Sequence, residues 1–189
     1  MEENEEVSTG TQSLGARARA RLASWRVVGV FGGIYLVSQA ALGAILQEVG
    51  SAEVLQLQTT LSPETFAAIL EQWRDAGLLD TYASHYYLDF VHPVWYSALL
   101  AALLAKALDA NDAPARWNAI LAVPFIAGGL DVVENLVHVY YLATGDAPTT
   151  GPVVMSGLAA NTKWTLAGLS LAAAAALGVR AMERRRRVD

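Results

Sequence analysis

The stretch AGGLDVVENLVHVYY, residues 127–141, places four polar side chains in a segment apolar enough to span a membrane: Asp131, Glu134, Asn135 and His138. At about 100° per residue, these side chains fall on one face of a helix, within an arc of roughly a quarter turn. A charged group in hydrocarbon costs several kcal/mol unless it is paired, protonated or hydrated. The stretch therefore predicts a membrane helix with a buried polar face.

Composition places the whole chain among membrane proteins. It has 189 residues, of which 54% are hydrophobic and only 16% are charged, and its mean hydropathy is +0.33. These values are too apolar for an ordinary soluble domain, and the length leaves room for one small bundle. The chain has no cysteine, which excludes disulfides, thiolate metal sites, thiol catalysis and a lipidated cysteine anchor.

Four apolar segments have the roughly 20 residues that are needed to cross a bilayer. They cover approximately residues 27–47, 82–108, 114–143 and 153–182. We therefore predict an all-α fold, a four-helix transmembrane bundle that forms a single membrane domain over residues 25–182. Pro93 and Pro124 lie inside two of these segments, where proline predicts a kink.

The long connection between the first two spans contains signals for another helix. Ser62, Pro63 and Glu64 are typical of an N-cap, a first helical residue and an acidic first turn. Apolar residues follow at helical spacing, at Phe66, Ile69, Leu70 and Trp73. The pattern predicts an amphipathic helix in the outer loop, which either lies on the membrane surface or covers the bundle, or is a packed loop helix without a gating role.

The basic residues predict the orientation. Residues 1–24 are interpreted as a disordered cytoplasmic tail and residues 183–189 as a basic cytoplasmic tail that contacts anionic lipid. Eleven of the 13 lysine and arginine residues fall in these tails or at the same side of the predicted bundle. The positive-inside rule then places both termini in the cytoplasm and the protein in the cytoplasmic (inner) membrane.

Polar residues of the four predicted spans lie at similar depth, in the outer half of the bundle. The acid-base groups expected there are Asp89, Asp131, Glu134 and Lys163. We expect Asp89 and Glu134 to exchange protons, and Asp131 and Lys163 to set the pKa values of those two groups. The residues expected to orient a ligand are Gln39, His92, Tyr96, Asn135 and His138. His85, Asp89, His92 and Tyr96 also share one helical stripe.

Charge accounting leaves several interpretations of this layer. Three carboxyl groups face one lysine, so one or more carboxyls are protonated, the histidines are charged, or a cation is bound. We expect no metal or other cofactor; the alternative is zinc or iron, held by ligands among His92, Asp89, Asp131, Glu134 and His138, with His85 nearby. The alternative to a functional site is a network that serves only to fix the packing of the helices.

Several motifs occur in order along the chain: Ser62-Pro63-Glu64, Tyr87-x-Asp89-x-x-x-Pro93-x-x-Tyr96, Asp131-x-x-Glu134-Asn135 and Lys163-Trp164. In these motifs the chain, from residue 27 to 179, resembles an uncharacterised family of small bacterial four-span integral membrane proteins. The resemblance implies the architecture and no activity. His92 stands where an aromatic residue is expected in that family, which weakens its assignment as a metal ligand.

A fainter similarity is to EXPERA-type sterol isomerases and sigma-2-receptor-like bundles. It rests on Pro93-Val94-Trp95-Tyr96, and it implies a bundle whose buried acids and aromatic residues surround an apolar ligand. The acidic residue that follows in that family is absent, since Ala101, Ala102 and Leu103 occupy the region. Isomerase activity is therefore not carried over.

These observations favour a membrane protein that binds a small or amphiphilic, lipid-like molecule, with acid-base chemistry as an extension. One alternative is a subunit of a proton- or cation-coupled transporter, and another is an assembly protein with a stabilising polar network. Membrane lipids are the expected partners. The chain carries no phosphate-binding loop, nucleophile elbow or nucleic-acid motif, so nucleic acid is not an expected partner.

Overall fold

The computed structural model describes residues 14–187. These residues are helical almost throughout and contain no strand. In chain order the elements are α1 (Leu14–Leu22), α2 (Trp25–Val49), α3 (Ser51–Thr59), α4 (Pro63–Asp75), α5 (Leu79–Ser84), α6 (Tyr86–Asp89), α7 (His92–Ala110), the 3-10 helix η1 (Ala115–Ala122), α8 (Val123–Thr144) and α9 (Thr150–Arg186). The all-α fold class predicted from the sequence is confirmed.

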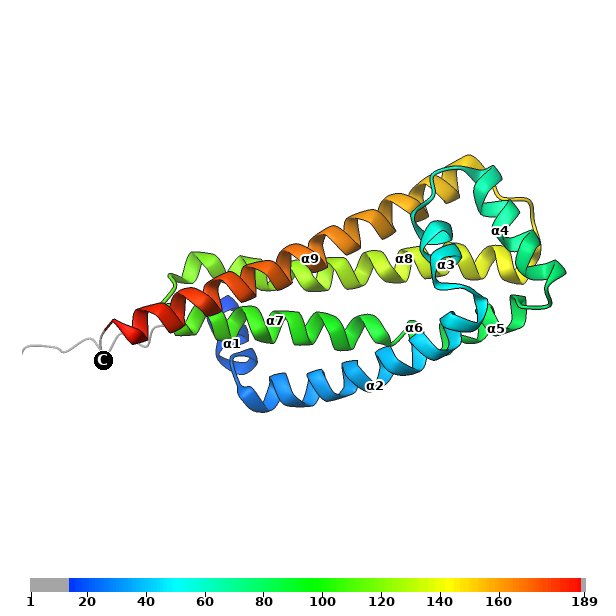
Figure 1. Ribbon diagram of the computed structural model, residues 1–189. Helices are drawn as coiled ribbons and strands as arrows, with labels where there is room; N and C mark the ends of the chain where they lie inside the picture. Colours follow the sequence, from blue (N-terminus) through cyan, green and yellow to red (C-terminus); the bar gives the residue numbers. More distant parts are fainter. Residues whose placement is uncertain (1–13, 188–189) are drawn as a thin grey trace, which may run out of the picture.

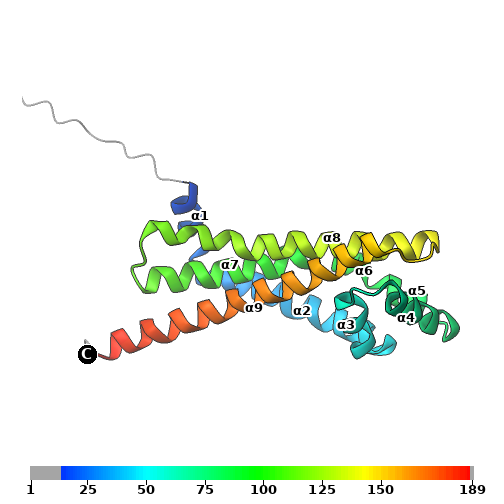
Figure 2. The same cartoon turned by 90° about the horizontal axis from the view of Figure 1, so that it is seen from above.

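Four segments of the described chain are long and apolar enough to cross a membrane: α2, α7, α9, and η1 together with α8. They run side by side, with α1 and the C-terminal end of α9 at one end of the molecule (Figure 1) and α3, α4 and α5 at the other. The view from above shows the same division (Figure 2). The molecule is thus an elongated bundle with a helical cap at one end.

The packing of the four long helices is uneven. Helices α7, α8 and α9 all contact one another, whereas α2 packs mainly on α7. Direct packing between α2 and α9 is slight by comparison. This separation of α2 from α9 positions the candidate site described below.

The second predicted span, residues 82–108, is shorter in the structure. Its long helix α7 begins at His92, and residues 79–89 form the two short helices α5 and α6. Pro93 has no N–H, so the carbonyl of Asp89 lacks a helical donor and a continuous helix is interrupted. Pro93 and Pro124 lie in the first turns of α7 and α8, where proline is tolerated. The disturbance expected at each proline therefore takes the form of a helix start, and not of a kink within one helix.

The predicted disordered tail, residues 1–24, is wrong for Leu14–Leu22, which form α1; residues 1–13 lie outside the described part. Alanine and arginine favour helix, and tertiary contacts hold α1 in place. The Arg19 guanidinium lies 2.5 Å from the Asp109 carboxylate and donates to the carbonyl of Ala113 at 2.7 Å. Leu22 adds an apolar contact at the end of the helix. The hydropathy pattern missed α1 because most of its residues are polar or small.

The predicted basic tail, residues 183–189, is likewise helical as far as Arg186, the last residue of α9. Arginine near a helix C-terminus interacts favourably with the helix dipole. The Arg184 guanidinium also donates to the carbonyl of Asn111 at 3.1 Å. Residues 188–189 lie outside the described part of the chain.

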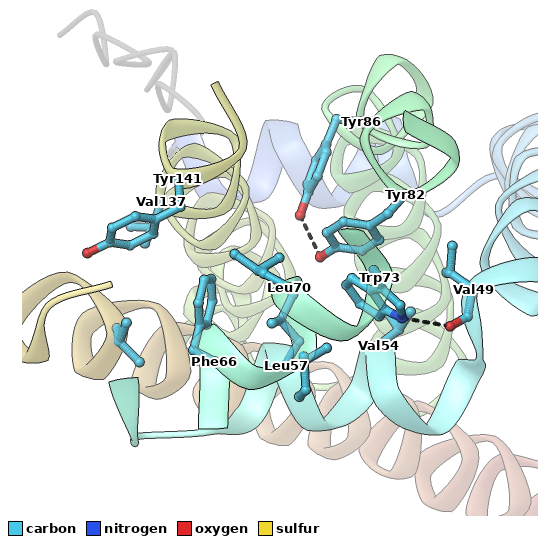
Figure 3. Close-up of a cluster of buried hydrophobic side chains, with 12 residues drawn as sticks. Val49, Val54, Leu57, Phe66, Leu70, Trp73, Tyr82, Tyr86, Val137 and Tyr141 are labelled. Atoms are coloured by element: carbon cyan, nitrogen blue, oxygen red, sulfur yellow. Dashed lines mark hydrogen bonds between the residues drawn. The ribbon is translucent and has the colours of Figure 1, made fainter. Parts of the chain in front are cut away.

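The helical cap has its own apolar core. Helix α4 begins at Pro63 after the N-cap Ser62, and its apolar face contributes to a buried cluster (Figure 3). The cluster joins α3, α4, α5 and α6 to the adjoining ends of α2, α8 and α9, and contains Val49, Val54, Leu57, Phe66, Ile69, Leu70, Trp73, Tyr82, Tyr86, Val137, Tyr141 and Val153. The Trp73 indole N–H donates to the Val49 carbonyl at 2.9 Å (Figure 3). The cap is therefore packed onto the bundle as part of one core.

Candidate functional site

A buried ion cluster joins α8 to α9. The Nζ atom of Lys163 lies 2.5 Å from Oδ1 of Asp131 and 2.7 Å from Oε2 of Glu134. All three residues are buried, and Glu134 is 0% exposed. Since one ammonium group meets two carboxylates, the cluster as a whole carries a negative charge unless a proton is bound. The predicted convergence of these three residues is present.

Asn135 lies beside this cluster and supports the start of α7. Its Nδ2 donates to the main-chain carbonyl of Asp89 at 3.4 Å. That carbonyl is the one left without a helical donor by Pro93. Asn135 therefore satisfies the broken backbone between α6 and α7, a role in positioning Asp89 that the sequence pattern did not indicate.

Asp89 has no lysine or arginine partner among the described residues. The nearest basic group to its carboxylate is Nε2 of His85, 3.9 Å from Oδ2. Asp89 is 9% exposed, and it lines a cavity of the described structure. It therefore presents an acidic group to that cavity.

His92 is held in a defined orientation against α2. The Ser38 hydroxyl donates to the carbonyl of Tyr35 at 3.0 Å, and its oxygen lies 2.9 Å from Nδ1 of His92. A hydroxyl has only one proton to donate, so Nδ1–H is the donor in the second bond. In the neutral ring Nε2 is then a hydrogen-bond acceptor, and the ring packs between Tyr35 and Tyr96.

His138 belongs to a separate buried network. Its Nδ1 lies 2.9 Å from the Tyr86 hydroxyl and 3.1 Å from the Tyr82 hydroxyl, and its Nε2 lies 2.9 Å from Oγ of Ser156. Both ring nitrogens thus have protein partners. This network links α5 and α6 to α8 and α9, and it does not reach the cavity wall.

The cavity lies between α2 and α9, where the two helices do not pack together. Its volume is about 590 Å³, within the range of small-molecule sites. Its walls come from α2, α3, α7 and α9, with one residue each from α6 and α8. Most of the lining is apolar, including Leu42, Leu46, Leu99, Leu103 and Leu171. Polar side chains also line the cavity, among them Gln39, Gln58, Asp89, His92, Tyr96, Asp131 and Lys163. The cavity is therefore amphiphilic in its own lining.

The structure divides the predicted site residues into two groups. Asp89, Asp131, Lys163, Gln39, His92 and Tyr96 line the cavity. Glu134, Asn135 and His138 do not line it; they are buried behind it, with Glu134 in contact with Lys163. The predicted direct ligand contacts of Asn135 and His138 are therefore not supported by the geometry.

Several cavity residues were missed by the sequence reasoning. They are Trp164, Gln58 and the leucines of α2, α7 and α9. Trp164 follows Lys163 directly, and the Lys163 ammonium lies 5.5 Å from the centre of its ring. No periodicity distinguishes a leucine that faces a cavity from one that faces lipid, so the sequence offered no signal for the apolar wall.

The alternative metal site does not assemble in this geometry. Within residues 14–187, no three histidine, aspartate or glutamate side chains come close enough together to hold a metal ion. Lys163 lies between Asp131 and Glu134, and both ring nitrogens of His138 are engaged by hydroxyl groups. The donors named for zinc or iron are therefore spread over separate contacts.

Comparisons with protein-family models, with curated proteins and with solved structures found no match for this chain. The resemblances drawn from the motifs stay predictions. The functional argument consequently rests on the geometry of the cavity.

Proposed function

We propose that the protein is a multi-pass membrane protein that binds an amphiphilic molecule in the cavity between α2 and α9. The observation that carries the proposal is the lining, which combines many apolar side chains with the buried polar residues Asp89, His92, Asp131 and Lys163. A molecule with a hydrocarbon body and a polar head matches both parts. The basic residues favour an orientation in the inner membrane with both termini on the cytoplasmic side and the cap on the opposite side.

The charges on the wall limit the head group. Lys163 already contacts two carboxylates, and Asp89 has no lysine or arginine partner within the described chain. An anionic head would meet these acids without a free cation to offset them. The proposed ligand therefore has a head group that donates hydrogen bonds, such as a hydroxyl or an amine.

The cavity offers a matched pair of glycines for a test. Gly168 lines the cavity and Gly178 does not, while both lie on α9 and neither would bring a Cβ within 4 Å of another group. We expect Gly168→Phe to fill the cavity and weaken ligand binding at least tenfold, and Gly178→Phe to leave binding unchanged.

The binding measurement uses the full chain in lipid nanodiscs and a fluorescent single-chain amphiphile, with an alcohol, an amine or a phosphate head on the same tail. Fluorescence anisotropy should show saturable binding of the alcohol or amine form and weaker binding of the phosphate form. Equal loss in the Gly168→Phe and Gly178→Phe variants, or no saturable binding of any form, would overturn the proposal.

A second function is favoured by one observation. The contact of Lys163 with Asp131 and Glu134 joins two spans in the interior, which is the arrangement expected of a network that fixes helix packing. In this alternative, the protein serves assembly and the polar layer is structural. Retention of fold and loss of amphiphile binding in Asp89→Asn, which leaves the ion cluster intact, would favour the binding function over this alternative.

A further inference from the structure

His85 and Asp89 lie one helical turn apart on the broken segment that precedes α7, and both are buried. Nδ1 of His85 contacts the main-chain carbonyl of Tyr82. A carbonyl oxygen only accepts hydrogen bonds, so Nδ1 carries a proton in every charge state of the ring that keeps this contact. The protonation of His85 therefore varies only at Nε2.

Nε2 of His85 faces the Asp89 carboxylate. Oδ2 lies 3.9 Å away, and Nε2 is buried with no hydrogen-bond partner among the described residues. If His85 were neutral and Asp89 ionised, the lone pair on Nε2 would face the lone pairs of the Asp89 carboxylate. This arrangement is costly in a buried setting. A small rotation of the carboxyl group or one bridging water closes the gap.

We propose that His85 is a positioning residue that shares one proton with Asp89, so that Asp89 presents to the cavity a carboxyl group able to give or accept a proton. In the transfer, the N–H bond at Nε2 breaks as an O–H bond forms at Oδ2, and the electron pair of the N–H bond stays on nitrogen. The pair has no net charge before or after. The use of this proton on a ligand rests on the proposed function, whereas the sharing itself does not.

The other titratable groups near His85 and Asp89 are mostly engaged in contacts of their own. The titratable groups around the pair are Asp131, Glu134 and His138 from α8, Lys163 from α9, His92 and Tyr96 from α7, and the tyrosines Tyr82 and Tyr86 of its own segment. The α8 acids already contact Lys163. His92 is bonded to Ser38 through Nδ1. His85 is therefore the nearest proton partner of Asp89.

The test measures the two groups directly, in ligand-free full-length protein in lipid nanodiscs. Nitrogen-15 NMR follows the imidazole of His85, and infrared difference spectroscopy follows the carboxyl band that disappears in Asp89→Asn, both across pH. We expect Asp89→Asn to weaken proton binding by His85 at least tenfold, because the carboxylate partner is lost. We expect His85→Gln to reduce the two-step titration of Asp89 to one step.

The matched control is His92→Gln, which removes another histidine near Asp89 and should change the proton affinity of His85 less than twofold. A change of less than twofold in Asp89→Asn overturns the proposal. If that variant does not fold, the wild-type spectrum decides, since a deprotonated Nδ1 of His85 at any pH of the folded protein also overturns it. Failure of amphiphile binding in the nanodisc assay leaves this result unaffected, so the two proposals fail separately.

Discussion

Lys163 is the residue on which the interior charge balance depends. Its ammonium group contacts carboxylates of Asp131 and Glu134 on the neighbouring helix, and its side chain is 6% exposed. Burial of three ionised groups is costly unless each has partners. The stability of the α8–α9 contact therefore depends on the complete cluster.

Removal of the lysine alone should be strongly destabilising. We expect Lys163→Met to lower the free energy of unfolding by about 3–5 kcal/mol, because two buried carboxylates lose their cation. Thermal unfolding in detergent measures the effect. Lys106→Met is the control, because Lys106 is only half-buried and lies over the Trp25 ring, so its loss should cost less. A triple variant that also carries Asp131→Leu and Glu134→Leu should recover part of the loss; equal melting temperatures for wild type and Lys163→Met would contradict the account.

At the residue scale, the sequence predicted part of the site. Helical spacing put Asp131 and Glu134 on one face, and depth put Lys163 at their level, and the three residues do meet. It could not predict that Asn135 and His138, on the same face, point to other partners. An arc of a quarter turn is wide enough for neighbours on it to face different helices, and only tertiary packing decides which.

At the scale of elements, Gly128 allows α7 and α8 to approach closely. A Cβ atom at this position would lie 2.5 Å from Oγ of Ser97 and 3.2 Å from the carbonyl oxygen of Pro93. The Ser97 hydroxyl donates to the carbonyl of Pro124 at 2.7 Å in the same contact. Small residues at such crossings let helix backbones pack closely in membranes.

The neighbouring glycine provides a control for this contact. We expect Gly128→Ala to cost about 1–3 kcal/mol, because the helices or the Ser97 side chain must shift to admit a methyl group. At Gly129, a methyl group would meet no atom within 4 Å, so Gly129→Ala should be neutral or slightly stabilising. Unfolding by increasing denaturant or heat compares the two variants, and equal stability of both would show that the close approach is not required.

The N-cap of α4 should respond to pH. The Ser62 hydroxyl accepts from the Thr65 amide at 3.1 Å and donates to the Glu64 carboxylate at 2.6 Å, which lowers the pKa of Glu64. A carboxyl with a lowered pKa adds stability above its unfolded pKa and loses it as pH falls through the folded value. Ser62→Ala should lower stability by about 1 kcal/mol at neutral pH and by less at about pH 3. Thermal melts at both pH values measure the difference; an unchanged or larger effect in acid would contradict the assignment.

The elements themselves were partly predictable. Apolar length predicted four long helices, and four such segments are present within residues 14–187. The start of α7 at His92 was not predicted, because an apolar, aromatic-rich segment has the same composition whether its helix is continuous or broken. Pro93 carried the relevant signal, since proline is favoured in a first turn and costly in a helix interior.

At the scale of the whole molecule, the separation of α2 from α9 creates the cavity. Helix α2 packs on α7, and α9 packs on α7 and α8, while α3 adds Val54 and Gln58 to the wall between them. Gly157 allows the connection after α3 to approach α9, since a Cβ there would meet the carbonyl oxygen of Thr60. Hydropathy could not predict this cavity, because lipid-facing and cavity-facing leucines look alike in sequence.

The most direct measurement is photo-crosslinking with an amphiphile that carries a diazirine in its tail and a hydroxyl or amine head. The probe is added to the full chain in nanodiscs, and mass spectrometry maps the labelled residues. The account predicts labels on cavity residues such as Leu100 and Leu103, reduced by Gly168→Phe and by excess unlabelled amphiphile. Two results together would contradict the account. The labels would be confined to outward-facing residues such as Leu136, which is 57% exposed, and Gly168→Phe would not reduce them.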